Sequence, residues 1–283
     1  MITCQLSGGL GNQLFQVFAT LAYSIRYNIS VMFEYKNETT EYRTPEGIQM
    51  RDTYWNTFFV HIIGLTTYSL ERNSGIDVSS FFPYKEPRFE YNKLPPEIST
   101  RNMKLVGYFQ SPLYFQDKEE YIFKLLKIQK LKEMIKKIYD FSEECVSLHF
   151  RIGDYQYLDE HPVLPLEYYK KSLRYIFQKR ENRNVLVFSQ KEDEILVDLQ
   201  LSILRREFPE ATFTKVDEHV SDWEQLLIMS CCRDNIIANS TFSWWGAYLN
   251  QGDKIVCYPK KWFNSSKNTS NMFPEDWVMV NEH

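Results

Sequence analysis

From residue 146 onward, short apolar runs alternate with segments of helical periodicity, and this alternation restricts the fold more than any other feature. The apolar runs predict strands at 146–151, 185–189, 211–216, 235–238 and 254–258. The segments between them predict helices at 166–180, 193–208 and 241–249, and a capping box of Ser221 and Glu224 starts another. Strands that alternate with helices favour a parallel, helix-covered sheet. We therefore expect a Rossmann-like α/β domain with a doubly wound, mostly parallel sheet.

The start of the chain has the pattern of a strand, a glycine turn and a helix. Ile2–Leu6 is a short apolar run, Ser7–Gly11 supplies the turn, and apolar residues then recur at helical spacing as far as Ile25. Val31–Glu34 is the candidate for a second strand. Residues 36–100 show no sustained period, so no element is assigned there.

An amphipathic pattern across residues 117–144 predicts one helix with lysines on its polar face. Because it precedes the regular alternation, we expect this helix to bridge two domains. A chain of 283 residues is long enough for two domains of ordinary size. The expected domains are residues 1–140 and 141–283.

Composition and charge exclude several classes of protein. The formal net charge of −4 provides no basic field for a nucleic acid backbone, so a nucleotide is a better candidate ligand than DNA. The 5 cysteines are scattered and include no C-x-x-C pair, which indicates reduced thiols. The sequence shows neither a signal peptide nor an apolar run of about 18 residues. We expect a cytoplasmic protein, attached to a membrane at most peripherally.

Polar residues alternate with apolar ones along the strand expected at 146–151. The two-residue strand period puts Ser147, His149 and Arg151 on one face. Arg151 stands at the carboxyl end, where open α/β sheets bind ligands, and its planar fork suits phosphate oxygens. The alternative is structural, with a buried His149 and an ion pair between Arg151 and Asp154.

A second polar segment, Asn239–Ser243, joins the strand expected at 235–238 to a helix. Free amides at a helix start, together with the helix dipole, attract anions. Asn and Ser are also common N-caps, and capping is compatible with anion binding. Trp244 and Trp245, which come next, are expected to pack in the core rather than to stack on a ligand.

The glycine segment Gly8–Gly11 allows close approach of backbone to a ligand. With Glu34 about 20 residues farther on, it imitates a dinucleotide fingerprint, so an NAD-dependent oxidoreductase is one alternative function. Leu14, however, occupies the third glycine position, and no Walker lysine follows. The 16% aromatic content allows a second alternative, a noncatalytic carbohydrate-binding protein. Neither alternative accounts for Arg151 together with 239–245.

Taken together, these segments resemble the α-1,2-fucosyltransferase family. The matching blocks, in the order of the family, are Gly8–Gln13, Tyr108–Ser111, His149-x-Arg151-x-Gly153-Asp154-Tyr155 and Ile236–Gly246. They spread over most of the chain, and the run from Ala238 to Gly246 is very specific.

The resemblance implies two Rossmann-like domains facing a cleft, the GT-B type of fold. It implies a galactoside α-1,2-fucosyltransferase that moves L-fucose from GDP-fucose, with inversion, to the 2-hydroxyl of a terminal β-galactoside in an oligosaccharide or glycan acceptor. The domain 141–283 would bind GDP-fucose, the domain 1–140 would hold the acceptor, and no cofactor would be needed. The expected catalytic residues are Arg151, His149 and Asp154. The expected donor-binding residues are Gly9, Gly11, Asn12, Gln13, Arg151, Ser189, Asn239, Ser240, Thr241 and Ser243.

The sequence departs from the family pattern in three places. Ile152 stands where the family usually has a second arginine, and Gln190-Lys191 follow Ser189 where it has an acidic pair. Arg233-Asp234-Asn235 replace a family histidine. These departures bear on guanine recognition, whereas the fold is expected to survive them.

No D-x-D triplet occurs in the sequence. Metal-dependent glycosyltransferases commonly present such a triplet to a divalent ion, whereas Arg151 and a helix start can neutralise a leaving group without one. We therefore expect transfer, or donor hydrolysis, to persist in excess chelator with at most a modest change in rate. Rates with and without EDTA test this expectation, and a complete loss that manganese or magnesium restores would contradict it.

Overall fold

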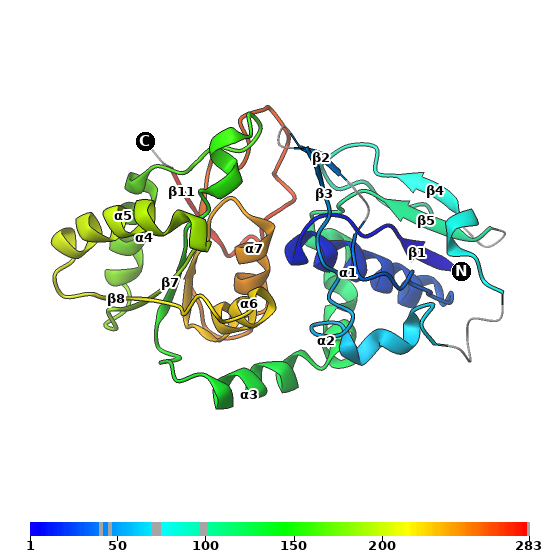
Figure 1. Cartoon of the computed structure of the whole chain (residues 1–283), viewed down its shortest axis with the longest axis horizontal. Coiled ribbons are helices and arrows are strands. Elements are labelled where there is room, and N and C mark those ends of the chain that lie inside the picture. The colour runs from blue at the N-terminus through cyan, green and yellow to red at the C-terminus, as the bar shows by residue number, and fades with distance from the viewer. Residues whose placement is uncertain (40–41, 45–46, 70–74, 97–100, 282–283) are drawn as a thin grey trace. The chain divides into compact units, whose positions relative to one another are not determined.

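The computed structural model of the chain describes residues 1–39, 42–44, 47–69, 75–96 and 101–281 (Figure 1). The chain divides into two compact units. The first unit comprises Met1–Gln129 and Lys267–Pro274, and the second comprises Lys130–Ser266 and Glu275–His283. The division therefore lies at residue 129, and a short segment near the C-terminus belongs to the first unit.

The second unit is built on a parallel sheet. Its strands are β6 (Val146–His149), β7 (Asn184–Phe188), β8 (Thr212–Lys215), β9 (Asp234–Ile236), β10 (Val256–Pro259) and β11 (Val278–Val280). They lie in the order β11-β10-β9-β6-β7-β8, and each neighbouring pair is parallel. This is the strand order of the Rossmann fold. The expected doubly wound parallel sheet is confirmed.

Helices cover the sheet of the second unit. They are α4 (Leu166–Phe177), α5 (Glu194–Glu207), α6 (Asp222–Cys231) and α7 (Thr241–Tyr248). In Figure 1, α4 and α5 lie on one side of the strands, whereas α6 and α7 lie on the other. The predicted capping box is present at the start of α6, where Ser221 N donates to Glu224 Oε2 at 3.2 Å.

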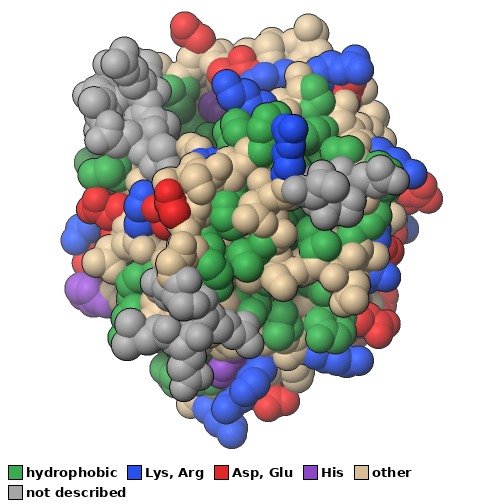
Figure 2. All heavy atoms as spheres, turned by 90° about the vertical axis from the view of Figure 1, so that its right-hand side faces the viewer, with side chains coloured by type: hydrophobic (Ala, Val, Ile, Leu, Met, Phe, Trp, Pro, Cys, Tyr) green, Lys and Arg blue, Asp and Glu red, His purple; other side chains and the backbone are tan. Residues whose placement is uncertain are grey.

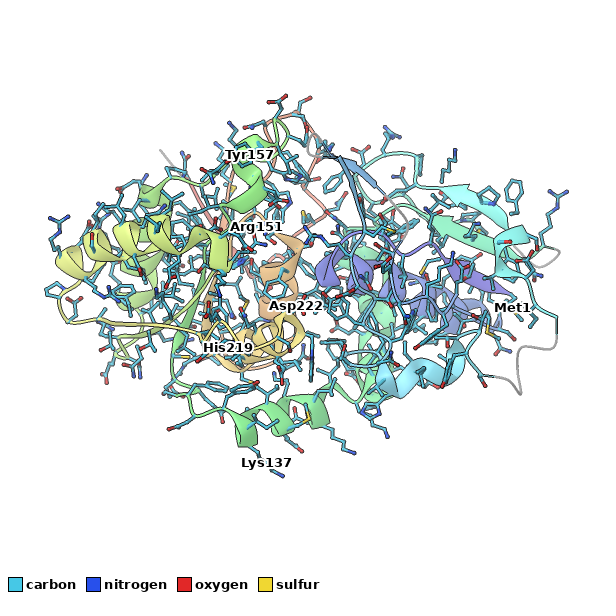
Figure 3. The ribbon with its side chains drawn as sticks, in the orientation of Figure 1. Met1, Lys137, Arg151, Tyr157, His219 and Asp222 are labelled. Atoms are coloured by element: carbon cyan, nitrogen blue, oxygen red, sulfur yellow. The ribbon has the colours of Figure 1, made fainter. Side chains whose placement is uncertain are left out.

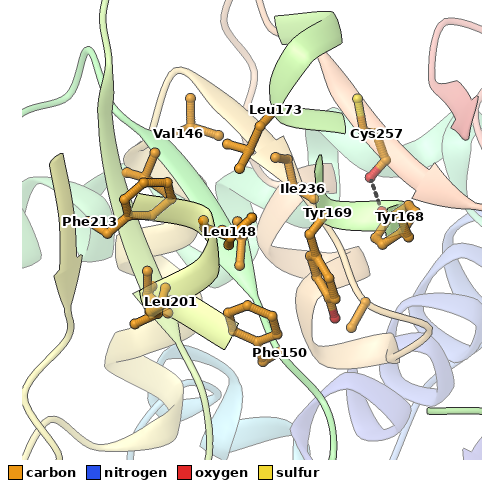
Figure 4. Close-up of a cluster of buried hydrophobic side chains, with 14 of the residues drawn as sticks. Val146, Leu148, Phe150, Tyr168, Tyr169, Leu173, Leu201, Phe213, Ile236 and Cys257 are labelled. Carbon is orange, nitrogen blue, oxygen red and sulfur yellow. Dashed lines mark hydrogen bonds between the residues drawn. The ribbon is translucent and has the colours of Figure 1, made fainter. Parts of the chain in front are cut away.

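The core on the α4 and α5 side is made of aliphatic and aromatic side chains (Figure 4). Leu148 of β6, Leu173 of α4 and Leu201 of α5 are completely buried. The hydroxyl of Tyr168 is buried with them and donates to the carbonyl oxygen of Cys257 at 3.0 Å. This bond offsets the desolvation of the phenol and ties α4 to β10.

The helices α6 and α7 approach closely at a glycine. A Cβ atom on Gly246 would lie 2.8 Å from Met229 Cβ and 3.0 Å from Met229 Sδ. Trp244 and Trp245 are completely buried beside this contact, and the Trp244 ring stacks on Tyr248 at 4.7 Å. The expected packing role of both tryptophans is confirmed.

The first unit contains a smaller parallel sheet in the order β1-β5-β4. Its helices and strands are β1 (Ile2–Cys4), α1 (Leu10–Tyr27), β4 (Phe82–Lys85), β5 (Met103–Val106) and α2 (Glu119–Leu126), with the antiparallel hairpin of β2 (Tyr42–Thr44) and β3 (Gly47–Gln49). The expected strand, glycine turn and helix at the start of the chain are confirmed. The α1 helix ends at Asn28, whose φ of 51° is a left-handed C-cap.

Two expectations for this half of the chain are wrong. Val31–Glu34 does not form a strand: Val31 bridges to Ile2 and Phe33 to Thr66, so the segment changes partner before a ladder can form. The helix expected at 117–144 is interrupted at Lys127, which has a φ of 53° and separates α2 from α3 (Ile128–Ile138). The apolar spacing continues across the break because the side chains on both sides are buried.

Figure 2 shows one face of the molecule. Apart from the residues drawn in grey, basic side chains lie on it in small separate groups among acidic, hydrophobic and other polar ones. Ion pairs such as Arg26 with Asp117, at 2.5 Å, neutralise basic groups of the first unit. On this face, the described residues form no basic track of the kind that follows a nucleic acid backbone.

The contact between α6 and α7 predicts a stability effect. We expect Gly246→Ala to lower the free energy of unfolding by about 1 to 2 kcal/mol, because overpacking outweighs the gain in helix propensity. Gly252→Ala is the control, since the nearest atom to its Cβ would be 3.5 Å away. Urea unfolding of both variants measures the difference. Equal stabilities would mean that Met229 moves aside at no cost.

Candidate active site

The strands β6 and β9 lie side by side where the strand order turns back along the chain. Their register pairs Val146 with Asp234 and Leu148 with Ile236. The strands β7 and β8 lie beyond β6, and β10 and β11 lie beyond β9. Ligands of open parallel sheets bind outside the carboxyl ends of the strands at such a switch point. Arg151 follows β6 and Asn239 follows β9, so both occupy this place in the topology.

Arg151 is held by the residues that follow it. Its Nη2 atom lies 2.5 Å from Asp154 Oδ1, and its guanidinium carbon lies 4.8 Å from the centre of the Tyr155 ring. The Arg151 side chain is 16% exposed, so a ligand can reach it while the carboxylate and the ring fix its plane. Figure 3 labels both ends of this stretch. Arg151 lies just after the carboxyl end of β6, and Tyr157 is the last residue of the 3-10 segment Gly153–Tyr157. The ion pair between Arg151 and Asp154 that the structural alternative predicted is present, and the exposed part of the guanidinium can still contact a ligand.

Asp193 holds the loop that carries Arg151. Its carboxylate is buried and accepts the backbone N–H of Gly153 at 2.7 Å and that of Ile152 at 3.3 Å. Gly153 has a φ of 25°, and a Cβ there would lie 2.4 Å from Gln190 Oε1. The loop therefore needs both the glycine and the distant carboxylate. Asp193 was not among the expected site residues, because in the sequence it reads only as the acidic start of a helix.

Asn239 ties together the loops around the end of β9. Its Nδ2 atom donates to the carbonyl oxygen of Pro162 at 2.9 Å and to that of Trp262 at 3.3 Å. Its Oδ1 atom is buried and has no hydrogen-bond partner within the described part of the chain. A buried acceptor of this kind carries a desolvation cost, which a ligand that donates a hydrogen bond would offset.

The N-terminus of α7 is capped by the side chain of the residue that directly precedes it. Ser240 Oγ accepts the N–H of Phe242 at 3.3 Å, and Ser243 Oγ donates to the carbonyl oxygen of Ser240 at 3.4 Å. The expected capping role is therefore confirmed for Ser240. Thr241 is the first residue of the helix and is partly exposed. The positive end of the α7 dipole thus lies on the segment that leaves β9, next to β6 in the sheet.

His149 is the last residue of β6 and is buried. Its Nδ1 atom has no hydrogen-bond partner among the described residues, and its ring lies 5.6 Å from that of Phe242. Burial, together with the charge of Arg151, lowers the pKa of His149 to about 3. The imidazole is therefore neutral at physiological pH, and it is a weak base there.

Ile152, Asp234 and Asn235, three of the residues that replace family residues, are buried in the fold, whereas Lys191 is exposed. Ile152 is buried in the core cluster of the second unit. Asp234 pairs with Arg180 at 3.2 Å, and Asn235 Nδ2 donates to Ser147 Oγ at 2.7 Å between β9 and β6. These side chains stabilise the sheet. Nearby, the partly exposed Ser189 follows β7, in line with its expected place at a strand end.

The remaining donor-binding candidates lie in the first unit, at the start of α1. Gly9 is the N-cap and Gly11 is in the first turn. Asn12 Oδ1 accepts from Gln110 Nε2 at 3.0 Å, and Gln13 Nε2 donates to the carbonyl oxygen of Gly8 at 2.9 Å. The structure thus groups Arg151, Asp154 and Asn239 within one unit. The donor contacts of Gly9, Gly11, Asn12 and Gln13 stay predictions.

The described residues offer neither a membrane span nor a cluster of metal ligands. No helix there is long and apolar enough to cross a membrane. In the same part of the chain, no group of three or more His, Cys, Asp or Glu side chains could hold a metal ion.

The buried His149 predicts a pH-dependent stability. The pKa of His149 is about 3 in the folded chain and about 6.5 in the unfolded chain. Between about pH 3 and pH 6.5 the imidazole is therefore protonated in the unfolded chain only, so the free energy of unfolding falls as the pH falls. From pH 7 to pH 5 this group should remove about 2 kcal/mol of unfolding free energy. Urea unfolding at both pH values should therefore show a smaller loss in His149→Gln than in the wild type. The control is His219→Gln, whose side chain is 86% exposed. Equal losses in His149→Gln and the wild type would refute the assignment.

Comparisons with known proteins agree with the sequence motifs. The chain matches glycosyl transferase family 11 over residues 76–281. The O-antigen biosynthesis glycosyltransferase WbnK of Escherichia coli is 28% identical over 313 residues, covering 98% of this chain and 99% of that protein. An alpha-1,2-colitosyltransferase of Escherichia coli is 28% identical over 297 residues, covering 99% of each. Among solved structures, POFUT1 in complex with GDP-fucose has a TM-score of 0.49 at 13% identity, covering 98% of this chain and 97% of that chain.

The family match includes the segments that carry Arg151 and Asn239, and it covers most of the chain. The two relatives match this chain along almost their entire length. We conclude that the chain is a glycosyltransferase and belongs to glycosyl transferase family 11, the family of the α-1,2-fucosyltransferases that its motifs resemble.

Proposed function

We propose that this glycosyltransferase moves L-fucose from GDP-fucose to the 2-hydroxyl of a terminal β-galactoside in a glycan acceptor, with inversion and without a metal ion. The observation that carries the proposal is the position of Arg151 and the start of α7 on the segments that leave the neighbouring strands β6 and β9. A guanidinium and a helix N-terminus both favour anions, and a diphosphate is the anion of a nucleotide-sugar donor.

In the proposed reaction, the acceptor hydroxyl attacks the anomeric carbon, the bond between that carbon and the diphosphate oxygen breaks, and the proton of the hydroxyl passes to water. Negative charge then develops on the departing GDP. Arg151 stabilises it with charge-assisted hydrogen bonds, and Ser240 and Thr241 lie at the helix start that adds its dipole. Donors that are already held in place cost little reorganisation as the charge forms.

The two other catalytic candidates receive different roles in this proposal. Asp154 contacts Arg151 at 2.5 Å, so we assign it to orienting the guanidinium. His149 has a pKa of about 3, which makes it a poor acceptor for the proton of the attacking hydroxyl at neutral pH. We assign it instead the role of a neutral imidazole at the end of β6 that forms a hydrogen bond to the bound substrate.

Colitosyl transfer is the second candidate, because one relative is an alpha-1,2-colitosyltransferase. Colitose lacks the 3-hydroxyl of fucose and is otherwise the same sugar, so the leaving group and the linkage would not change. A site that hydrogen-bonds the 3-hydroxyl discriminates strongly against the deoxy sugar, whereas an apolar site discriminates weakly. The donor therefore has to be decided by direct competition.

A donor panel tests the proposed function. The wild-type protein is incubated with GDP-fucose, GDP-colitose, GDP-mannose or NAD, and its melting temperature and the transfer to a β-galactoside are measured. GDP-fucose at about 100 times its Kd should stabilise the folded chain by about 2.7 kcal/mol. NMR of the product should show an α-1,2 linkage. Faster transfer of colitose would favour the second candidate, and saturable binding of NAD without binding of any GDP-sugar would refute both.

Arg151 should be essential to the chemical step. We expect Arg151→Lys to lower kcat on the order of a hundred- to thousandfold, because lysine keeps the charge but loses the planar, two-pronged geometry. Arg174→Lys is the control, since the Arg174 side chain is 47% exposed on α4. Steady-state transfer is measured once circular dichroism has verified a native fold. Near-normal turnover in Arg151→Lys would reduce Arg151 and Asp154 to a structural pair.

A further inference from the structure

Tyr155 contacts the candidate catalytic arginine and a second aromatic ring at the same time. The guanidinium carbon of Arg151 lies 4.8 Å from the centre of the Tyr155 ring. The same ring stacks on His161, with 4.6 Å between centroids and 24° between planes. Because both contacts involve the ring, the orientation of Tyr155 limits the orientations open to Arg151.

The hydroxyl of Tyr155 reaches the other segment of the site. It donates to the carbonyl oxygen of Asn239 at 3.1 Å. Asn239 directly precedes Ser240, the N-cap of α7, and its own side chain is bonded to the carbonyl oxygens of Pro162 and Trp262. The ring of Tyr155 thus contacts Arg151, which follows β6. Its hydroxyl bonds to the backbone of Asn239, which follows β9 and leads into α7.

The protonation state of Tyr155 is consistent with this link. Burial raises the pKa of its phenol above the ordinary value, although the charge of Arg151 acts in the opposite direction. The hydroxyl therefore keeps its proton at neutral pH, and only a protonated phenol can donate to a carbonyl oxygen.

We infer that Tyr155 is a positioning residue that holds the guanidinium of Arg151 in a fixed relation to the N-terminus of α7, so that both act on the same diphosphate. The inference rests on the proposed role of Arg151 at the leaving group. Tyr155 itself stabilises no charge on the donor and acts through Arg151. Transition-state stabilisation requires donors to be in place before the charge develops, and a misplacement of about 1 Å can cost about a hundredfold in rate.

Three variants separate the two links of Tyr155. Tyr155→Leu removes the ring and the hydroxyl, and we expect kcat to fall on the order of ten- to a hundredfold with little change in the KM for the acceptor. Tyr155→Phe keeps the ring and removes the hydroxyl, so the loss should be smaller, about two- to tenfold. Tyr157→Leu is the control, because Tyr157 lies on the same 3-10 segment and is 67% exposed.

A double-mutant cycle tests whether Tyr155 acts through Arg151. If it does, adding Tyr155→Leu to Arg151→Lys should lower kcat by less than about threefold, because the geometry that Tyr155 maintains is already lost. The same factor in both backgrounds would overturn the inference. So would a folded Tyr155→Leu variant whose turnover equals that of Tyr157→Leu. Thermal unfolding of each variant separates a loss of fold from a loss of positioning.

A binding measurement keeps the inference independent of the sugar that is transferred. Calorimetry with GDP and with inorganic pyrophosphate should give a weaker Kd for Tyr155→Leu than for the wild type and for Tyr157→Leu, since both ligands retain the diphosphate. If the wild type binds them but transfers no fucose, the proposed donor sugar fails and the role of Tyr155 stands. Equal Kd values for the wild type and Tyr155→Leu would reject that role even if fucose is transferred.

Discussion

The pairing of β6 with β9 is the constraint on which the rest of the second unit depends. These strands come from segments almost 90 residues apart, and their register pairs Ser147 with Asn235. The bond from Asn235 Nδ2 to Ser147 Oγ, at 2.7 Å, adds a buried side-chain link to the backbone ladder. A shift in register would move the segments that carry Arg151 and Asn239 relative to each other, so the geometry of the candidate site follows from this pairing.

Beyond the strand ends, where the backbone hydrogen bonds of the sheet stop, side chains from other parts of the chain hold the loops in place. The loop after β6 has few regular backbone bonds, and Asp193, at the start of α5, supplies two acceptors for its N–H groups. Tyr155 then joins that loop to Asn239. A buried carboxylate or amide is costly to desolvate, and hydrogen bonds from several donors offset that cost. Here they fix the loops that carry Arg151 and Asn239.

Much of the second unit could be predicted because its signals are local. Apolar runs bounded by turn residues located the strands, and the Ser221–Glu224 capping box marked the start of α6 correctly. The first unit was harder. One left-handed residue, Lys127, divides an amphipathic pattern that is continuous in the sequence, and Val31 and Phe33 find different bridging partners. Periodicity describes which side chains become buried, and it is insensitive to one backbone torsion or to the choice of partner strand.

The sequence by itself determined the alternation of strands and helices, the placement of Arg151 and Asn239 at strand ends, and the resemblance to a family of fucosyltransferases. Each of these depends on residues close together in the chain or on a specific motif. The tertiary structure decided the strand order, the contact of Tyr155 with Asn239 and the role of Asp193. It also showed that burial lowers the pKa of His149 to about 3. These contacts and this desolvation arise only when segments distant in the sequence meet, and no local pattern encodes them.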